Sequence, residues 1–409
     1  MLTSQSPRFA RLFLLPLTVS LLSLNACKKD KDAPQPAPPA GPGTSANTVT
    51  VPCAGIITNT TWANVEPDST KLDYIVTCEM EVSAGVLTIA PGVRIRFDGP
   101  ESGLSCRDAG GIKALGTALL PITFESAQLV RGAWAGLRFN SRNADNTLTF
   151  ARVRYAGSKD ISYQTLGKAG VVVDTYGRLT MNNSRVETCS GTGVIIDGDA
   201  TLSAFAGNVV RDCELNPVLT SFKMLGVLGI NNRLTGNGEN AIRIYTDGLV
   251  TTDNVRVKEL GVPCHIHCEV YFRDGNLTLD PGVTLAFASD ASLQVYDGTL
   301  TALGTVAKPI TLRGLQAGQG TWMGLSIGSN GPNRMDHCVV DGGGAARISY
   351  TDGKGGIVIG IFVQPGRLTI SNSTVRNSLG HGISKKPTST LSATTMTYSG
   401  NELGDVGNY

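Results

Sequence analysis

The chain carries one pattern twice, and this repetition constrains its fold more than any other feature. The segment "CEMEVSAGVLTIAPGVRIRF" (78–97) aligns without a gap with "CEVYFRDGNLTLDPGVTLAF" (268–287). The correspondence continues through "PITF" and "PITL", "WAGL" and "WMGL", and "GRLTMNNSRV" and "GRLTISNSTV". Two copies of about 190 residues therefore follow each other, so the fold must be one that a second copy can extend.

Each copy is built from shorter units of roughly 20 to 28 residues, in which short alternating apolar runs are separated by turns. Leu87 and Ile89 precede one such turn at Pro91-Gly92, and another alternating run follows it. Only 17% of the residues are charged and 49 are glycine, which favours strands and turns over helices. These units predict a right-handed parallel β-helix, in which the inward side chains of each coil fill a narrow core.

The same motifs carry a resemblance to a known class of protein. The strings "LTIAPGVRIRF", "ALGT", "PITF" and "WAGL", with their second-copy partners, resemble the β-helix lipoproteins of Gram-negative bacteria, within the pectin-lyase-like solenoids. The resemblance covers nearly everything after residue 48. It implies an all-β fold in which copy one (48–220) and copy two (221–409) stack in one continuous helix, and it implies no particular reaction.

The first 26 residues have the features of an export signal. Arg8 and Arg11 precede an apolar run of about 13 residues, which is too short to span a bilayer. The run ends in "LNAC", which resembles the lipobox of bacterial lipoproteins and implies that Cys27 becomes the lipid-bearing N-terminus. The alternative is an ordinary secretory signal with an incidental cysteine.

A polar segment separates this signal from the repeats. Residues 27–47 contain "KKDKD" and then a stretch rich in Pro, Ala and Gly, which predicts a disordered, solvated tether. Lys28, directly after the cysteine, implies delivery to the outer membrane by the same resemblance. We therefore expect a lipid anchor in the outer membrane, with the body on its periplasmic or cell-surface side.

The motif "VPCHIHC" raises the question of a metal site, because it holds two cysteines and two histidines. Strand alternation places Cys264 and Cys268 on the core face and His265 and His267 on the outer face, so the four cannot enclose one ion. A smaller metal site of His265, His267 and Glu269 remains a hypothesis. The alternative is two exposed histidines on a polar face.

Eight cysteines besides Cys27 lie in a chain whose compartment permits disulfides. Cys189 and Cys213 occupy equivalent places in consecutive units, and stacked strands lie about 4.8 Å apart, so this pair is the first disulfide candidate. Cys53 and Cys78 are the second candidate. The other cysteines are expected to be buried thiols.

An enzyme must be weighed because parallel β-helices include polysaccharide lyases and glycoside hydrolases. The string "GHG" (380–382) is similar to a polygalacturonase motif, but that family's Asn-Thr-Asp and Asp-Asp strings are absent, and hydrolysis needs two carboxyl groups. The other copy has "GTG" at this turn. A lyase would need a basic residue beside acids that bind calcium, so calcium is expected only for that alternative.

Outward charges and one aromatic residue are the remaining surface features. Alternation directs the side chains of these candidates to solvent, and the alternative is a cross-strand ion-pair ladder. The candidates for surface binding are Glu79, Glu81, Arg94, Arg96 and Tyr271.

We expect a polysaccharide-binding or adhesion module without catalysis. A lyase or hydrolase acting on acidic polysaccharide and a structural envelope component are the alternatives. Removal of the signal leaves equal numbers of acidic and basic residues, so nothing directs the protein to nucleic acid. No resident cofactor is expected, and the protein is expected to be a monomer.

Overall fold

The computed structural model describes residues 43–245, 248–250 and 254–409. The predicted signal peptide, the lipidation site Cys27 and most of the tether lie outside these residues. The part of the chain that is described contains no helix long and apolar enough to cross a membrane. Its one described helix is the short 3-10 helix η1 (Phe222–Gly226).

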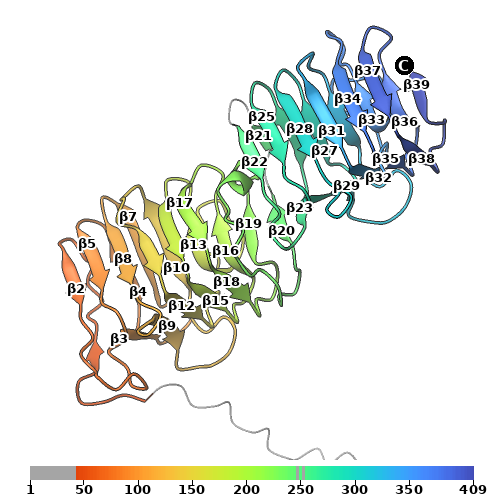
Figure 1. Cartoon of the computed structure of the whole chain (residues 1–409). Helices are drawn as coiled ribbons and strands as arrows, with labels where there is room; N and C mark the ends of the chain where they lie inside the picture. The colour runs from red at the N-terminus through yellow and green to blue at the C-terminus, as the bar shows by residue number, and fades with distance from the viewer. Residues whose placement is uncertain (1–42, 246–247, 251–253) are drawn as a thin grey trace, which may run out of the picture. The chain divides into compact units, whose positions relative to one another are not determined.

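The strands of copy one form three parallel sheets that follow one another along each coil (Figure 1). We call them sheets I, II and III. Sheet I contains β1 (Val49–Thr50), β3 (Tyr74–Val76), β6 (Arg94–Phe97), β9 (Ile122–Ser126), β12 (Ala151–Arg154), β15 (Arg185–Glu187) and β18 (Val209–Arg211). Sheet III contains β2 (Thr60–Trp62), β5 (Val86–Ile89), β8 (Gly111–Leu115), β11 (Thr147–Thr149), β14 (Arg178–Asn182) and β17 (Thr201–Ala206).

Sheet II runs through both copies without a break. Its copy-one strands are β4 (Glu79–Val82), β7 (Gly103–Asp108), β10 (Leu137–Ser141), β13 (Ala169–Val173), β16 (Thr192–Ile196) and β19 (Val218–Thr220). Its other strands are β20 (Ile242–Ile244), β23 (Cys264–Ile266), β26 (Thr284–Phe287), β29 (Ile310–Gly314), β32 (Cys338–Asp341), β35 (Thr374–Arg376) and β38 (Thr397–Ser399). Direct pairing of β19 with β20 joins the copies.

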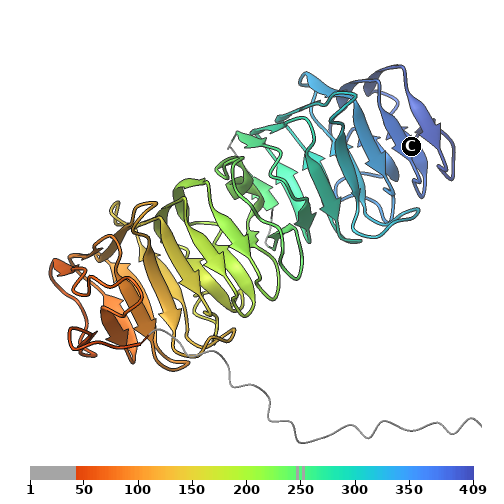
Figure 2. The ribbon, with the colours of Figure 1, turned by 60° about the horizontal axis from the view of Figure 1, so that its bottom comes forward.

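Two further sheets complete copy two. Sheet IV contains β21 (Gly248–Val250), β24 (Glu269–Phe272), β27 (Ser292–Val295), β30 (Gly324–Ile327), β33 (Gly355–Ile359), β36 (His381–Lys385) and β39 (Val406–Asn408). Sheet V contains β22 (Val255–Val257), β25 (Asn276–Leu279), β28 (Thr299–Leu303), β31 (Asn333–Asp336), β34 (Arg367–Ser371) and β37 (Thr390–Thr394). Each strand pairs in parallel with the corresponding strand of the next coil (Figure 2). This arrangement confirms the predicted right-handed parallel β-helix.

Sheet II changes its role where the copies meet. The repeat aligns Glu79 in sheet II with Glu269 in sheet IV, and Arg94 in sheet I with Thr284 in sheet II. Sheet II therefore carries the second strand of each copy-one coil but the first strand of each copy-two coil. As a consequence, equivalent outer surfaces of the two copies lie on different sheets.

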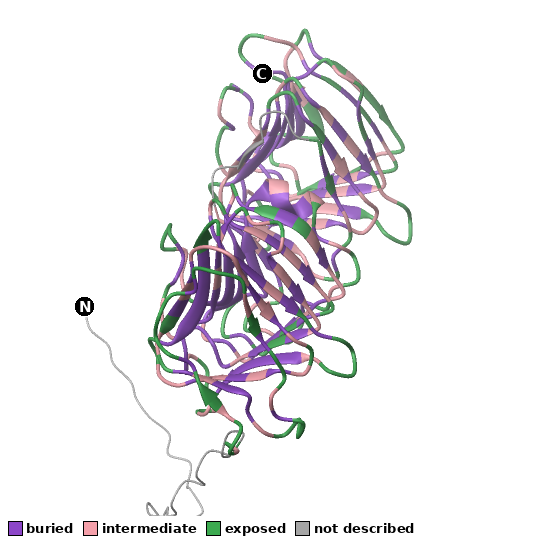
Figure 3. Ribbon diagram, turned by 90° about the vertical axis from the view of Figure 1, so that its left-hand side faces the viewer, coloured by how far each residue is buried: buried purple, intermediate pink, exposed green. Residues whose placement is uncertain are grey.

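The packing of the core in copy one recurs in copy two. The ring of Trp134 stacks on Phe97 at 4.1 Å, and the ring of Trp322 stacks on Phe287 at 4.3 Å. Each indole N–H donates to a backbone carbonyl of the next coil, at 2.7 Å in copy one and 2.9 Å in copy two. Buried residues follow the strands and exposed residues gather in the connecting loops (Figure 3).

Candidate functional site

Only the second of the two predicted disulfides forms. Cys53 and Cys78 are bonded, with their Cα atoms 6.0 Å apart. The prediction for Cys189 and Cys213 is wrong, because both are buried free thiols. Each thiol instead donates to the backbone carbonyl two residues before it, Cys189 to Glu187 at 3.7 Å and Cys213 to Arg211 at 3.6 Å.

The proposed metal site is also wrong. Strand alternation is confirmed, since Cys264 is buried and His265 is only partly buried. However, His265 lies in β23 of sheet II and places its Nδ1 atom 2.5 Å from Glu239 Oε1, whereas Glu269 lies in β24 of sheet IV. Among the described residues, no group of three or more His, Cys, Asp or Glu side chains is arranged to hold a metal ion.

The four charged surface candidates do not form one site. Arg94 and Arg96 lie on sheet I and pair with Glu125 at 2.5 Å and with Asp98 at 2.9 Å, respectively. The acidic candidates lie on sheet II. Glu79 is 3.5 Å from Lys159, and Glu81 is 2.7 Å from Arg107. These side chains therefore act in ion pairs, as the alternative held, although with other partners than the sequence suggested.

The fifth candidate, Tyr271, belongs to a cluster of tyrosines on the outer face of sheet IV. Its ring lies 6.3 Å from that of Tyr296, and the ring of Tyr296 lies 5.4 Å from that of Tyr350 in an edge-on arrangement. Burial raises the pKa of Tyr296 well above its ordinary value, and the neighbouring tyrosines add to this rise. The Tyr296 hydroxyl is therefore a protonated donor at physiological pH.

A loop, residues 344–353, crosses this face and completes the cluster. Its Ile348 packs against Met323 and Val358, which fixes the loop on the sheet. Ser349 Oγ donates to Glu269 Oε1 at 3.1 Å, across a separation of 80 residues. The next residue, Tyr350, is 54% exposed, so its ring faces solvent at the edge of the cluster.

Two buried polar side chains continue the row that begins at Tyr271. The strand registers place Gln294 and Ser326 beside Tyr271 on the next two coils. Glu269 Oε2 accepts hydrogen bonds from Gln294 Nε2 at 2.6 Å and from Ser292 Oγ at 3.1 Å. Together these contacts hold one carboxylate and the Gln294 amide in fixed orientations.

Three polar atoms of the cluster are buried without a hydrogen-bond partner. They are Gln294 Oε1, Tyr296 OH and Ser326 Oγ. Burial of an unpaired polar atom costs roughly 1–3 kcal/mol, so such atoms are rare without a reason. All three atoms are covered by neighbouring groups of the protein, so the surface that is open to a second molecule is that of the partly exposed tyrosine rings.

Copy one has different residues at the same positions. Glu81 and Arg107, which form an ion pair, correspond to Tyr271 and Tyr296. Arg138 pairs with the buried Asp174 at 2.6 Å. The copy-two counterparts of Arg138 and Asp174 are Ser326 and Gly360. The ion pairs of copy one are thus replaced in copy two by tyrosine, serine and glycine, which lie around the carboxylate of Glu269.

Sequence reasoning found Tyr271 and Glu269 but missed the rest of the cluster. The missed residues are Ser292, Gln294, Tyr296, Ser326, Ser349 and Tyr350. One signal was available, because "ISY" occurs in both copies (161–163 and 348–350) and marks the crossing loop in each.

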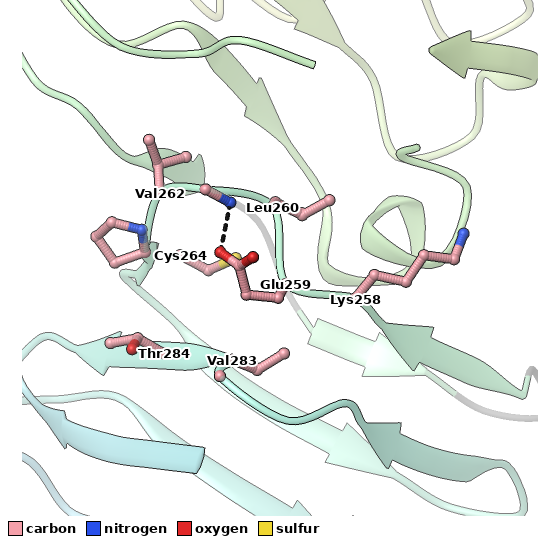
Figure 4. A pocket seen from close by; sticks show the side chains of 10 residues that line it. Lys258, Glu259, Leu260, Val262, Cys264, Val283 and Thr284 are labelled. Atoms are coloured by element: carbon pink, nitrogen blue, oxygen red, sulfur yellow. Dashed lines mark hydrogen bonds between the residues drawn. The ribbon is translucent and has the colours of Figure 1, made fainter. Parts of the chain in front are cut away.

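A separate hollow lies under the turn at 258–263, against Gly282 and Val283 (Figure 4). Glu259 Oε1 accepts the Gly261 N–H at 2.8 Å, so its carboxylate closes the turn. Lys258 Nζ points to the Gly226 carbonyl at 3.4 Å. The charged side chains of this hollow are therefore used by the backbone, and it is a weaker candidate than the tyrosine cluster.

No protein-family model matches the chain, and the comparisons with curated proteins and with solved structures also find no match.

Proposed function

We propose that this chain is a carbohydrate-binding protein without catalysis, which binds a glycan on the outer face of sheet IV. A sugar presents hydroxyl groups that donate and accept hydrogen bonds, and C–H faces that pack on aromatic rings. The tyrosine cluster offers both kinds of contact. The observation that carries the proposal is the row of three neighbouring tyrosine rings, Tyr271, Tyr296 and Tyr350, the last of them 54% exposed, on one outer face.

Binding fits the cluster better than hydrolysis. Glycoside hydrolysis requires two carboxyl groups on either side of the scissile bond. Among the described residues, the hydrogen bonds of the cluster converge on one carboxylate, that of Glu269, and both its oxygens accept bonds from neutral donors. Such a carboxylate is suited to hold sugar hydroxyls.

The export signal and the tether support an outer-membrane location for this binding protein. The resemblance of "LNAC" to a lipobox, with Lys28 after the cysteine, supports a lipid anchor at Cys27 in the outer membrane. A tether of Pro, Ala and Gly would give the β-helix reach from that anchor. In this proposal the lipid anchors the protein to the membrane, and polysaccharide is the partner of the body.

An array of neutral and acidic polysaccharides, followed by calorimetry on the mature chain, tests this function. Tyr350→Ala should weaken binding by about tenfold, because a stacked ring contributes on the order of 1 kcal/mol or more. The matched control is Tyr163→Ala at the equivalent, 75% exposed position of copy one, which should leave binding unchanged. Equal losses in both variants, or release of shortened sugar products, would contradict the proposal.

A further inference from the structure

The outer face of sheet I in copy one carries two rows of side chains that differ in charge pattern. One row is Arg96, Glu125, Arg154, Glu187 and Arg211, in which positive and negative charges alternate from strand to strand. Opposite charges in this row are paired, since Arg211 Nε lies 2.8 Å from Glu187 Oε1 and Arg154 lies between Glu125 and Glu187 at 4.0 and 3.9 Å.

The corresponding row of copy two shows that such a ladder is structural. The counterparts of Glu125, Arg154 and Glu187 are Arg313, Asp341 and Arg376. Every sign is inverted, yet the alternation is kept, and Arg376 lies 2.9 Å from Asp341. Charge alternation between neighbouring strands is thus sufficient to explain this row in both copies.

The second row has no such explanation. It reads Arg94, Thr123, Arg152, Arg185 and Val209, and it contains no acidic residue. Arg152 and Arg185 are register partners on β12 and β15, so two positive charges lie on adjacent strands. Like charges at directly opposed positions destabilise a sheet, which makes this pairing costly unless an anion joins them.

Among the residues that the structure describes, neither of these two arginines forms a close ion pair, so both guanidinium groups are available to bind an anion. Arg152 is exposed and forms no ion pair within the described part of the chain. The Arg185 side chain is 48% exposed, and its nearest carboxylate atom, on Glu187, is 3.9 Å away. The same Glu187 carboxylate is already engaged more closely by Arg211.

Both arginines line a groove along the outer edge of sheet I. Two adjoining hollows share Ala118, Pro121 and Arg152; Arg185 lines one of them and Arg94 lines the other. In copy two the counterparts of Arg152 and Arg185 are Val339 and Thr374, so the basic pair occurs in copy one alone.

We propose that Arg152 and Arg185 form a binding site for a phosphate monoester. Two guanidinium groups supply two positive charges and pairs of parallel N–H donors that match phosphate oxygens. A phosphate monoester carries close to two negative charges at neutral pH, whereas a carboxylate, a sulfate ester or a phosphodiester carries one. The site therefore selects the doubly charged group, whether a sugar or a lipid headgroup presents it.

Calorimetric titration of the mature chain with glucose 6-phosphate, inorganic phosphate and glucose 6-sulfate tests the site. We expect both phosphates to bind several-fold more tightly than the sulfate near pH 7.5. Their binding should weaken toward pH 5, because the second pKa of a phosphate monoester is about 6 while arginine stays charged. Equal binding of sulfate, or binding of the phosphates that does not change with pH, would overturn the assignment.

The variant Arg152→Val/Arg185→Thr gives the site the residues of copy two, which the same strand pair already accommodates there. It should weaken phosphate binding by at least about tenfold, because charge-assisted bonds are lost, while its thermal unfolding midpoint stays level or rises. Arg142→Gln/Arg178→Gln removes equal charge elsewhere in copy one and should bind as the wild type does. Equal phosphate affinity in the site variant and the wild type would overturn the proposal.

Two further probes identify the source of the phosphate. With the variant Cys27→Ser, which carries no lipid, vesicles containing phosphatidic acid should bind more protein than vesicles of phosphatidylcholine alone, and soluble glucose 6-phosphate should compete with them. A DNA oligonucleotide, whose phosphates are diesters, should compete poorly. Vesicle binding without any affinity for soluble phosphates, or competition by DNA as strong as by glucose 6-phosphate, would refute a site for the monoester group.

Discussion

The outer face of sheet II in copy one and that of sheet IV in copy two have the same origin but opposite character. Both are crossed by a loop that contains "ISY", and both are built on the same coil. In copy one the charges pair with each other, as Arg138 does with Asp174. In copy two Ser326 has no partner, and tyrosines replace the ion pair of Glu81 and Arg107. The comparison shows that the coil folds without ion pairs on this face, so the tyrosine surface of copy two can be assigned to something other than folding.

The largest effect is expected where copy one relies on a buried charge. Arg138→Ser gives copy one the residue of copy two but leaves the Asp174 carboxylate, whose side chain is 1% exposed, without its cation. We expect a loss of about 3 kcal/mol in the free energy of unfolding, because an unpaired buried charge is costly.

Urea unfolding of the two single variants makes the comparison quantitative. Ser326→Ala, at the equivalent place in copy two, should raise the free energy of unfolding by on the order of 1 kcal/mol, because it removes a buried hydroxyl that has no hydrogen-bond partner. If Arg138→Ser also raised stability or left it unchanged, the two faces would not differ in the way described.

A smaller effect, on binding alone, is expected from an exchange of surfaces. Tyr271→Glu/Tyr296→Arg installs the ion pair that copy one forms at 2.7 Å between Glu81 and Arg107. The variant should keep its fold, as judged by circular dichroism, and should lose glycan affinity by at least about tenfold, because two aromatic contacts disappear. Undiminished affinity would show that the tyrosines are not the contact surface.

The smallest effect concerns the pH dependence of stability. It arises at a position where copy two has His267 and copy one has Thr77. Burial, and next the positive charge of Arg243, lower the pKa of His267 below its ordinary value of 6.5. The folded state then binds fewer protons than the unfolded state, so this contribution to stability is complete above about pH 6.5 and is lost as the pH falls toward the folded pKa.

The variant His267→Thr isolates this contribution. Its thermal unfolding midpoint should decline less between pH 7.5 and pH 5 than that of the wild type. Parallel curves for the two proteins would mean that His267 is protonated equally easily in the folded and unfolded states.

The sequence predicted the coil but not the sites on it. Repetition and alternation were enough to predict a parallel β-helix, the burial of Cys264 and the outward direction of Tyr271. Alternation tells inside from outside, but it does not say at which residue the chain turns a corner from one sheet to the next. For this reason Arg94 and Glu79, which seemed to be neighbours, lie on different sheets.

The tyrosine cluster depends on a contact that no local pattern contains. Ser349 reaches Glu269 only because the 344–353 loop folds back across earlier coils. Spacing likewise suggested a bond between Cys189 and Cys213, but a similar spacing is bridged at Cys53 and Cys78 and not there, so spacing alone does not decide which pair bonds.

Hydrogen–deuterium exchange of the mature chain, with and without the glycan that binds most tightly on the array, tests the central claim directly. The account predicts slower exchange in β24, β27, β30 and the loop 344–353 when the glycan is present, and no change in the equivalent copy-one loop, residues 157–168. Protection of the copy-one loop, or protection spread equally over both copies, would contradict it.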